Sequence, residues 1–478
     1  MHTYHQPKGR DKTMVKDMTE GTPWQIILQF TVPMLIGNIF QQLYNVVDSL
    51  IVGRFVGAGA LAAVSTSFPI IFLLISMILG LTMGSSIIIS QFFGAGEIEK
   101  MRHAVTTTVI FQMGAAIIMS IIGVLLAEPF LHLLRVPEDI FAEALIYARI
   151  FFSGIVFLFG YNSLSGILRS VGDSTTPLIF VAVAAVTNIG LDYHYVVNLG
   201  WGVAGAAWAT VISQALSMVL CYGYIVWRIP VLKFTSRADL VFDKDILVAA
   251  LKLGIPSSIQ QTVVSLGMMA LQGLVNSFGT ATMAAYAAGS SIESFCAMPI
   301  MNFGGALSTF SGQNVGAWKL DRVKRGTRDT LIMSMIACII TSVLVFYGGP
   351  LLIELFLDAE LDGTSEVVAL GVEYLQTMAM FYFIFVFMST FGGVLRGTGD
   401  TVYPMVASIT SLAVRVGTAY ILSPMIGHMA IWISFPVGWA VGAIIPVVRF
   451  YTGAWQQKAR ERYEHMLSLA GKEAASEG

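Results

Sequence analysis

Charged residues are scarce in this chain. Asp, Glu, Lys and Arg together make up 12% of the 478 residues, whereas hydrophobic residues make up 56% and the mean hydropathy is +0.75. Soluble globular domains carry about 25% charged residues, and a large soluble core does not account for so large a deficit. A lipid environment does. The composition therefore predicts a protein surrounded by the bilayer, and we expect no nucleic-acid partner.

Reactive residues are scarce as well. The three cysteines, Cys221, Cys296 and Cys338, lie in apolar stretches at no metal-ligand spacing, so we expect small hydrophobic side chains rather than a disulfide framework. The sequence contains no P-loop, no His/Cys metal cluster and no nucleophile motif. A membrane-embedded enzyme would need a paired nucleophile and base or a metal site. We therefore expect a protein that is not an enzyme and that has no cofactor.

One motif occurs twice. Residues 166–177 have the sequence GILRSVGDSTTP, and residues 393–404, which start 227 positions later (393 minus 166), have the sequence GVLRGTGDTVYP. Pro33 and Pro256 repeat in the same way at an offset of 223. The chain is therefore a doubled unit. Long apolar stretches flank each copy, and a duplicated helical membrane chain is typical of transporters.

The duplication also indicates what the motif does. In the first copy Arg169 could pair with Asp173, and in the second Arg396 could pair with Asp400. Residues that the scaffold needs should appear in both copies of a doubled chain. The two motifs are therefore predicted to turn the chain on its inner side rather than to contact a substrate.

Twelve apolar stretches have the length of about 20 residues that crosses a bilayer. The first six predicted helices are 24–52, 61–89, 104–127, 139–165, 177–198 and 202–227. The second six are 247–275, 283–310, 329–349, 367–391, 402–423 and 429–449. Because an even number of helices separates the two copies, both enter the membrane in the same orientation. The predicted fold class is an all-α polytopic membrane protein with 12 transmembrane helices in two six-helix lobes related by a parallel internal repeat.

The basic residues indicate which side of the membrane each loop faces. If the N-terminus lies inside, the inner segments hold 22 of the 27 Lys and Arg residues, whereas the outer loop 350–366 is acidic. Such an excess of positive charge marks cytoplasmic loops, so both termini are predicted to be cytoplasmic. The predicted parts are a cytoplasmic N-terminal arm (1–23), an N-lobe of helices 1–6 (24–227), a cytoplasmic linker (228–246), a C-lobe of helices 7–12 (247–449) and a cytoplasmic C-terminal tail (450–478).

Four polar residues of the first lobe are predicted to form a cation site. A charged side chain in hydrocarbon costs about 2.5–3.5 kcal/mol, so each one needs a reason. Asp192 lies in the outer half of its helix, with Asn188 one turn earlier on the same face. Asp48 lies near the outer end of the first helix, and Thr210 lies on the sixth. Two carboxylates, an amide oxygen and a hydroxyl suit Na⁺, and they equally suit a proton shared between carboxylates.

The repeat separates functional from structural acids. The counterparts in the second copy are Leu271 for Asp48, Ala419 for Asp192 and Arg415 for Asn188. Acids that the scaffold needs should appear twice, so acids that appear once are better explained by function. The structural alternatives are a helix-capping role for Asp48 at the outer interface and a hydrogen-bonded structural role for Asp192.

Glu293 is a candidate of a different kind. It lies inside the eighth predicted helix, and its repeat counterpart is Ile71, so this acid also occurs in one half only. A carboxylate facing a cleft between the lobes could attract a cationic substrate, with Arg415 as a second candidate for substrate binding. The alternative is a structural acid paired with a neighbour such as Arg415.

A series of short motifs runs through residues 20–450. They are Pro33; Gln41-x-x-Tyr44-x-x-x-Asp48 with Gly53; Leu61-Ala62-Ala63; Gln91-x-x-Gly94; Leu168-Arg169-x-x-Gly172-Asp173-x-x-x-Pro177; Asn188-x-x-x-Asp192; Gly202-Val203-x-Gly205-Ala206-Ala207; and Gly312-Gln313-Asn314-x-Gly316-Ala317. Each motif alone is weakly specific. Together and in this order they resemble the multidrug and toxic compound extrusion (MATE) family of cation-coupled exporters, within the wider MOP type.

The resemblance implies two six-helix lobes, alternating access by a rocking motion, and an N-lobe site for Na⁺ or H⁺. The family's site residues fall on Asp48, Asn188, Asp192 and Thr210, which would be the sodium ligands if the protein is sodium-coupled. Some branches place a coupling Glu in helix 7, but residues 247–275 contain no acid. Coupling is therefore expected in the N-lobe.

The expected function is that of a secondary active antiporter. It would export amphipathic, often cationic, organic compounds in exchange for Na⁺ or H⁺, as a monomer in a bacterial cytoplasmic (inner) membrane. The alternative is a lipid-linked precursor flippase of the same superfamily. A flippase for anionic headgroups should line its cleft with several Arg or Lys residues, and only Arg415 and Arg149 are available for that task.

Overall fold

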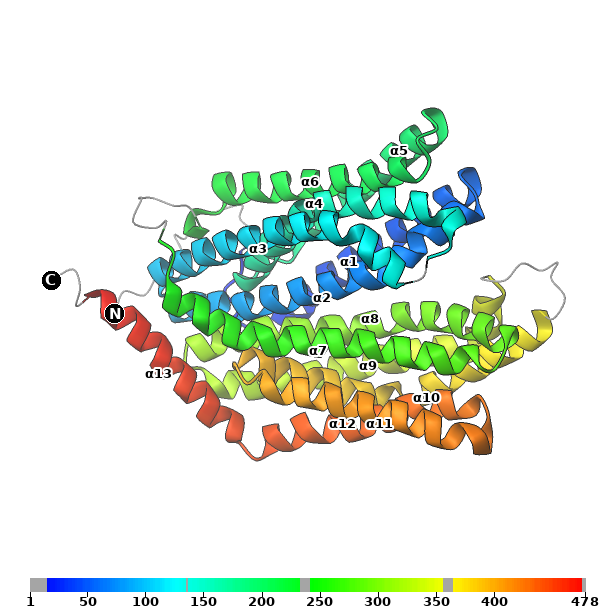
Figure 1. Cartoon of the computed structure of the whole chain (residues 1–478). Coiled ribbons are helices and arrows are strands. Elements are labelled where there is room, and N and C mark those ends of the chain that lie inside the picture. Colours follow the sequence, from blue (N-terminus) through cyan, green and yellow to red (C-terminus); the bar gives the residue numbers. More distant parts are fainter. Residues whose placement is uncertain (1–14, 135, 233–240, 356–363, 475–478) are drawn as a thin grey trace. The chain divides into compact units, whose positions relative to one another are not determined.

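The computed structural model describes residues 15–134, 136–232, 241–355 and 364–474, and these residues form helices and connections but no strand (Figure 1). The first half contains α1 (Pro23–Phe55), α2 (Ala58–Ala95), α3 (Ile98–Leu133), α4 (Glu138–Ser170), α5 (Thr175–Asp192), η1 (Tyr193–Asn198), α6 (Gly202–Arg228) and η2 (Pro230–Leu232). The second half contains α7 (Lys244–Asn276), α8 (Thr280–Gly316), α9 (Leu320–Glu354), α10 (Thr364–Gly397), α11 (Val402–Ile426), α12 (Met429–Tyr451) and α13 (Ala454–Ala474).

The predicted fold class is confirmed. Each predicted span lies on one helix from α1 to α12, and the fifth span continues from α5 into η1. Among the described residues, eleven helical segments are long and apolar enough to cross a membrane. The remaining helix, α8, has 37 residues, and its many Ser, Gly and Thr residues lower its hydropathy. Several helices extend a turn or more beyond the apolar stretch, because helical hydrogen bonding continues where apolar composition ends.

Parts of the predicted segments lie outside the described residues. These parts are residues 1–14 of the N-terminal arm, 233–240 of the linker, 356–363 of the acidic outer loop and 475–478 of the tail. The described part of the tail is mostly helical, since α13 spans Ala454–Ala474. This helix was not among the predicted spans because its composition is strongly polar.

The chain divides into two compact units. The first unit draws on Met1–Asp17, Val32–Ser258 and Leu469–Gly478, and the second on Met18–Thr31 and Ile259–Ser468. These bounds differ from those of the predicted lobes. The first turns of α1 belong to the second unit, and the first half of α7 belongs to the first unit. Composition could not show this, because a long apolar helix looks the same whichever bundle it packs against.

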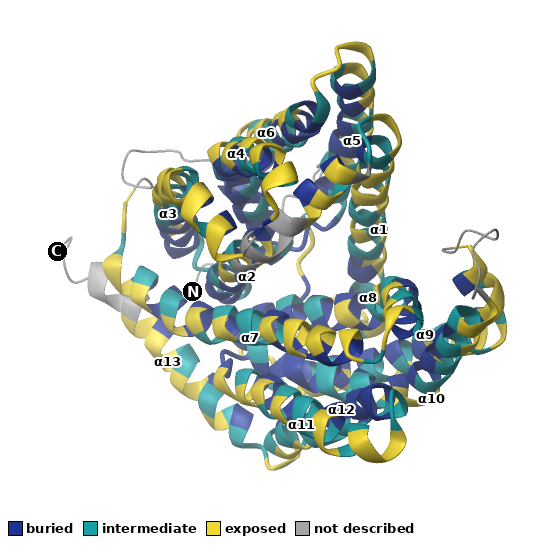
Figure 2. Ribbon diagram, turned by 45° about the vertical axis from the view of Figure 1, so that its right-hand side comes forward, coloured by how far each residue is buried: buried dark blue, intermediate teal, exposed yellow. Residues whose placement is uncertain are grey.

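The first unit is held together around α4. Its buried aromatic side chains Phe152 and Phe159 pack with buried residues of α2 and α6 in one apolar cluster. Gly154 and Gly160 allow α6 to approach closely, because a Cβ at either position would overlap Val211 or Met218. Figure 2 shows the buried residues as dark blue segments along these helices. The packing fixes α6 against α4, and α5, which carries Asn188 and Asp192, packs mainly on α6.

The second unit has a core rich in aromatic residues. Tyr374 and Tyr382 of α10 pack with Trp432, Phe435 and Trp439 of α12, and all five are buried. The repeat counterparts of Asp48 and Asp192, which are Leu271 and Ala419, lie in the same apolar cluster, and each is 0% exposed.

The twin motifs form the same turn in both units. Gly172 and Gly399 adopt left-handed backbone angles, with φ of 86° and 85°. The amides of Asp173 and Asp400 donate to the carbonyls of Leu168 and Leu395 at 2.9 and 2.8 Å. Each of these two hydrogen bonds closes the turn in which the chain reverses direction. The turns connect α4 to α5 and α10 to α11.

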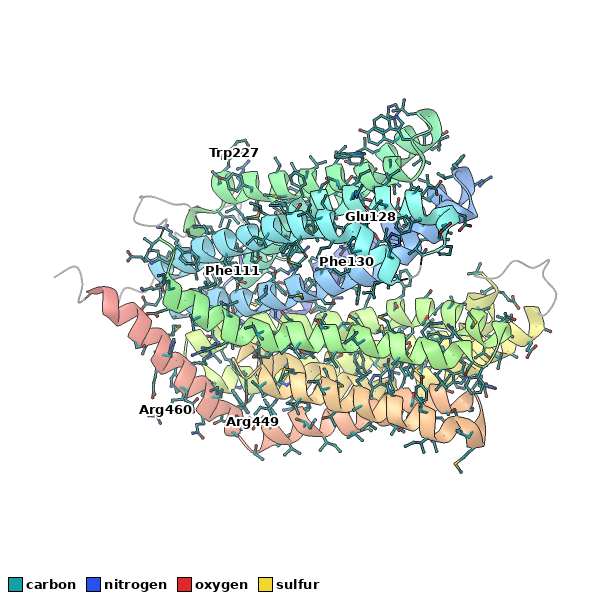
Figure 3. The ribbon with its side chains drawn as sticks, in the orientation of Figure 1. Phe111, Glu128, Phe130, Trp227, Arg449 and Arg460 are labelled. Carbon is teal, nitrogen blue, oxygen red and sulfur yellow. The ribbon has the colours of Figure 1, made fainter. Side chains whose placement is uncertain are left out.

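The two ion pairs that the motifs suggested are not formed. The Oδ1 atom of Asp173 accepts hydrogen bonds from the amides of Thr175 and Thr176, at 3.1 and 2.9 Å, and so caps α5. The Asp400 carboxylate instead accepts a hydrogen bond from Nε of Arg449, at the end of α12, where Figure 3 labels that side chain. Asp173 is therefore held by two threonines of its own motif, whereas Asp400 is held by an arginine far beyond its motif, which the motif alone could not reveal.

Candidate cation site

The predicted site residues of the first unit come from three helices. Asp48 lies on α1, seven residues before its end, whereas Asn188 and Asp192 lie on α5, and Asp192 is its last residue. Asn188 is 1% exposed and Asp192 is 0% exposed. One carboxyl group is thus fully buried at the end of a helix that the Asp173 cap begins.

The structure brings Asp48 and Asp192 together. The two carboxyl groups lie close enough for direct electrostatic interaction and, once one of them holds a proton, for a hydrogen bond between them. Tyr44, one turn before Asp48 on α1, and Tyr147 on α4 both lie within electrostatic range of the two acids. A carboxyl pair on α1 and α5 with two phenol groups beside it is therefore the centre of the site.

Most polar atoms of this group have no partner among the described residues. They are Oδ1 of Asp48, both carboxyl oxygens of Asp192, and both side-chain atoms of Asn188. Buried polar groups in proteins are almost always hydrogen-bonded, and an unpaired one in a membrane costs several kcal/mol. Oxygens of this kind, in such number, are suited to a bound proton or a hard cation.

A change of helical winding follows the buried acid directly. After Asp192 the chain forms η1, a π-helix of six residues, Tyr193–Asn198. The amide of Trp201 then donates to the carbonyl of Tyr195 at 2.9 Å. π-turns are rare and occur frequently at functional sites, because they shift the side chains of neighbouring turns. The fifth span was predicted as one uniform helix. The sequence therefore predicted where Asp192 lies but not the π-helix that follows it.

Two residues of the site were not predicted from the sequence. Nε2 of Gln214, on α6, donates a hydrogen bond of 3.4 Å to the hydroxyl oxygen of Tyr44, and Oε1 of Gln214 is buried without a partner. Tyr147 is the other. Gln214 follows Thr210 by four residues, so both lie on one face of α6. The spacing from Thr210 was the signal that could have identified Gln214.

Thr210 has a less central position than predicted. It is partly buried, and no hydrogen bond between its hydroxyl and an acid is formed among the described residues. It lies one turn before Gln214, which contacts Tyr44 directly. The structure therefore groups Asp48, Asp192 and Gln214 and leaves Thr210 beside them.

The two candidates in the second unit do not form the ion pair that the structural alternative for Glu293 suggested. The hydroxyl of Tyr374 donates to the carboxylate of Glu293. The Arg415 guanidinium lies over the ring of Phe435, 4.0 Å from its centroid. Arg415 and Glu293 lie within electrostatic range of each other but form no salt bridge in the part of the chain that the structure describes. The partner of the acid is therefore a tyrosine rather than the arginine.

The chemistry of the first site favours a small cation. Within the described residues, no group of three or more His, Cys, Asp or Glu residues could hold a metal ion. Two carboxylates with an amide oxygen can hold Na⁺ or one proton. The residues present thus fit either ion, and the choice between Na⁺ and H⁺ does not follow from the donor set.

Comparisons with known proteins agree with the doubled organisation. A family model described as MatE matches the chain twice, at residues 33–194 and at residues 256–421. The chain is 32% identical over 444 residues to the probable multidrug resistance protein YoeA of Bacillus subtilis, covering 91% of this chain and 95% of that protein. It is 23% identical to the probable multidrug resistance protein NorM of Thermotoga maritima, covering 92% and 95%.

Solved structures show the same fold. A MOP superfamily transporter from Pyrococcus furiosus, described as having a binding pocket of reverse polarity, superposes with a TM-score of 0.85 over 94% of this chain and 98% of its own, at 23% identity. An outward-facing multidrug resistance MATE family transporter gives the same TM-score, coverage and identity. At such identity these structures establish the fold alone.

Proposed function

Since the chain belongs to the MATE family of membrane transporters, we propose that it is a secondary active antiporter that exports amphipathic, often cationic, organic compounds in exchange for Na⁺ or H⁺. The names of several relatives refer to multidrug resistance, which supports a broad substrate range. The proposed location is a bacterial cytoplasmic membrane, with both termini on the cytoplasmic side and the protein acting as a monomer.

The observation that carries the proposal is the pair formed by Asp48 and Asp192. Burying two acids next to each other without a compensating arginine or lysine is costly. If the two acids only stabilised the fold, their carboxyl oxygens would be expected to accept hydrogen bonds from neighbouring residues. Here three of their four oxygens have no hydrogen-bond partner among the residues that the structure describes. A proton or Na⁺ that binds between them would relieve both the repulsion and the unmet hydrogen bonding, so binding and helix position are linked.

Alternating access gives this linkage a use. Occupancy by a cation changes the charge between α1 and α5, and a ligand shifts a conformational equilibrium only by its differential affinity for the two states. Reversal of a 1:99 ratio needs about 5.5 kcal/mol of such difference. A cation that enters this largely buried dicarboxylate site can supply a large part of that free energy. Export would then be driven by the inward movement of the cation.

The substrate-binding role of the second unit follows from Glu293 and Arg415. Glu293 is held by Tyr374, which fixes one carboxylate oxygen and leaves the other lone pairs for a cationic compound. If Glu293 attracts organic cations, the Glu293→Gln protein should transport ethidium less well while a neutral amphiphile is exported as before. Equal losses for both classes would indicate a structural acid.

A flippase for lipid-linked precursors is the less favoured function. Such a protein should present several Arg or Lys residues to the headgroup. Of the two arginines available, Arg149 donates a 3.0 Å hydrogen bond to Glu128 and is therefore already paired. Figure 3 labels Glu128 on α3. One arginine remains, which is few for an anionic headgroup.

The test of the antiport proposal is transport by the purified protein in proteoliposomes. Ethidium movement is followed by fluorescence while a Na⁺ gradient and a pH gradient are imposed separately. We expect one of the two gradients to drive transport in the parent protein and neither to drive it in Asp192→Asn. Full gradient-driven transport by a well-inserted Asp192→Asn protein would refute the coupling role, and transport in the absence of either gradient would refute antiport itself.

A further inference from the structure

Among the described residues, the buried polar atoms that lack hydrogen-bond partners differ in kind between the two candidate sites. Around Asp48 and Asp192 most of them are acceptors, the oxygens of Asp48, Asp192 and Asn188, beside one donor, Nδ2 of Asn188. In the aromatic cluster around Glu293 they are donors. The three are Nε of Arg415, Nε1 of Trp432 and the hydroxyl of Tyr382. A group of acceptors suits a cation, so a group of donors suits the opposite kind of ligand.

These donors belong to one continuous cluster. Trp432 is 0% exposed and Tyr382 is 1% exposed. The ring of Tyr374 contacts that of Trp432, with centroids 4.8 Å apart, and that of Phe435, at 6.0 Å. Phe435 in turn lies under the Arg415 guanidinium at 4.0 Å. The cluster thus joins α10, α11 and α12 within the second unit.

Glu293 does not satisfy these donors. Its carboxylate takes the hydroxyl of Tyr374, while Arg415 and Tyr382 lie within electrostatic range of the acid without a hydrogen bond to it. A guanidinium stacked on an aromatic face keeps its N–H edge directed outward in the plane of the group. That edge is the part of Arg415 that binds carboxylates and phosphates. Buried donors without an acceptor are costly in a membrane, and a ligand that supplies one would be bound strongly.

We propose that the second unit binds the anionic, hydrogen-bond-accepting group of a transported compound, with Arg415 as the charged donor and Trp432 and Tyr382 as neutral donors. The ligand class is an amphipathic compound that bears a carboxylate, including zwitterions whose cationic group is attracted by Glu293. This inference rests on the proposed export of organic compounds, because it specifies which compounds the second unit selects.

The test is direct binding to the purified protein in nanodiscs, and it does not depend on transport. The probes are 1-pyrenebutyrate and 1-pyrenebutanol, which share the apolar part and differ in the carboxylate. Binding is followed by the fluorescence of the pyrene, with empty nanodiscs as the blank. The parent protein should bind the carboxylate more tightly than the alcohol. Arg415→Gln should weaken binding of the carboxylate roughly 10- to 100-fold and leave the alcohol unchanged, as expected for loss of a charge-assisted hydrogen bond.

Three variants separate this role from a structural one. Arg149→Gln removes one arginine whose partner is Glu128 in the first unit, and it should change neither affinity. Trp432→Phe and Tyr382→Phe each remove one donor while keeping an aromatic ring in the core. Each should weaken binding of 1-pyrenebutyrate alone by several-fold. These two variants also keep the proposal testable if Arg415→Gln fails to fold, which size-exclusion chromatography would reveal.

The outcomes distinguish the inference from the proposed function. Equal weakening of both probes, or no preference for the carboxylate in the parent protein, would overturn the anion site while gradient-driven ethidium export could still stand. A retained preference for the carboxylate in a protein that shows no coupled export would support the site and count against antiport. Repeating the titration with phosphatidylglycerol in the nanodisc identifies the source of the anion: competition would assign the site to a lipid phosphate and overturn the assignment to transported compounds.

Discussion

Nε of Arg449 lies 2.8 Å from the carboxylate of Asp400 and donates a hydrogen bond to it. The counterpart of this acid in the first repeat, Asp173, pairs with no arginine of the described chain and instead accepts three hydrogen bonds from Thr175 and Thr176. The same turn therefore has two structural tasks. In the first unit its acid starts α5, the helix that ends at Asp192, and in the second unit it fastens the end of α12.

Asp173→Ala should destabilise the protein by about 1 kcal/mol, because α5 loses its N-terminal cap. Asp173→Asn should cost much less, since an asparagine oxygen can still accept the amide hydrogen bonds. The unfolding midpoint of the two purified variants, measured by thermal scanning in the same detergent, checks this order. Similar losses in both variants would show that the charge rather than the cap is what stabilises the turn.

The same acid gives a pH dependence. Burial raises the pKa of Asp173 above its ordinary value, although hydrogen bonds from Thr176 and Thr175 lower it in part. Between the ordinary and the raised pKa the folded protein binds more protons at this position than the unfolded chain does, so this carboxyl makes folding more favourable as the pH falls through that range. As the pH falls through that range, the unfolding midpoint of Asp173→Asn should therefore drop relative to that of the parent.

The twin glycines should not respond equally to substitution. Both Gly172 and Gly399 have left-handed backbone angles, which cost about 1–2 kcal/mol for a residue with a Cβ. At Gly172 the Cβ would also overlap the backbone oxygen of Lys16, whereas at Gly399 it would lie 2.9 Å from Nε of the Arg462 side chain. A side chain can move aside more easily than a backbone.

Gly172→Ala should accordingly lower the unfolding midpoint more than Gly399→Ala does. Both variants can be compared in one thermal series, with Gly190→Ala as the control, because a Cβ there meets nothing within 4 Å. Equal effects of the two motif substitutions would mean that the segment at Lys16 rearranges freely.

Much of this architecture could be predicted from the sequence because it depends on patterns that extend over many residues. Apolar runs identified the helices, and the doubled motif at residues 166–177 and 393–404 gave the repeat. The absence of Asp48 and Asp192 from the second copy pointed to the two acids that the structure places together. At the corresponding positions of the second repeat, Leu271 and Ala419 are packed in an apolar core.

Other features depend on contacts that no local pattern encodes. The hydrogen bond from Gln214 to Tyr44 joins residues 170 positions apart, and the π-helix after Asp192 depends on how the connection to α6 packs. Likewise, Arg449 lies 49 residues beyond Asp400. The partner of Glu293 proved to be Tyr374 on another helix, although Arg415 was the more obvious choice by charge.

Gln214 should tune the cation site without forming its centre. Gln214→Leu removes the hydrogen bond to the hydroxyl of Tyr44, which lies within range of both acids. Loss of a hydrogen bond of this kind amounts to about 1 kcal/mol, so the cation concentration for half-maximal transport should rise several-fold. Export at saturating cation should change little. Tyr44→Phe removes the same bond from the other side and should have a matching effect, and two dissimilar shifts would show that one of the residues acts in another way.

Asp192 should be costly to the fold that contains it. Both of its carboxyl oxygens are buried without a hydrogen-bond partner in the described part of the chain, and Asp48 lies beside it. Asp192→Asn removes the like-charge repulsion while preserving shape, so the apo protein should become more stable by about 1 kcal/mol even as coupled export is lost.

The control introduces an acid at the position in the second repeat that corresponds to Asp192. Ala419→Asp places an uncompensated acid in the apolar core of the second unit and should cost about 3–5 kcal/mol. Thermal unfolding without and with the coupling cation checks both. The cation should stabilise the parent and leave Asp192→Asn unchanged, since a ligand stabilises only a protein that binds it. A clear loss of stability in Asp192→Asn would instead identify this residue as part of the scaffold.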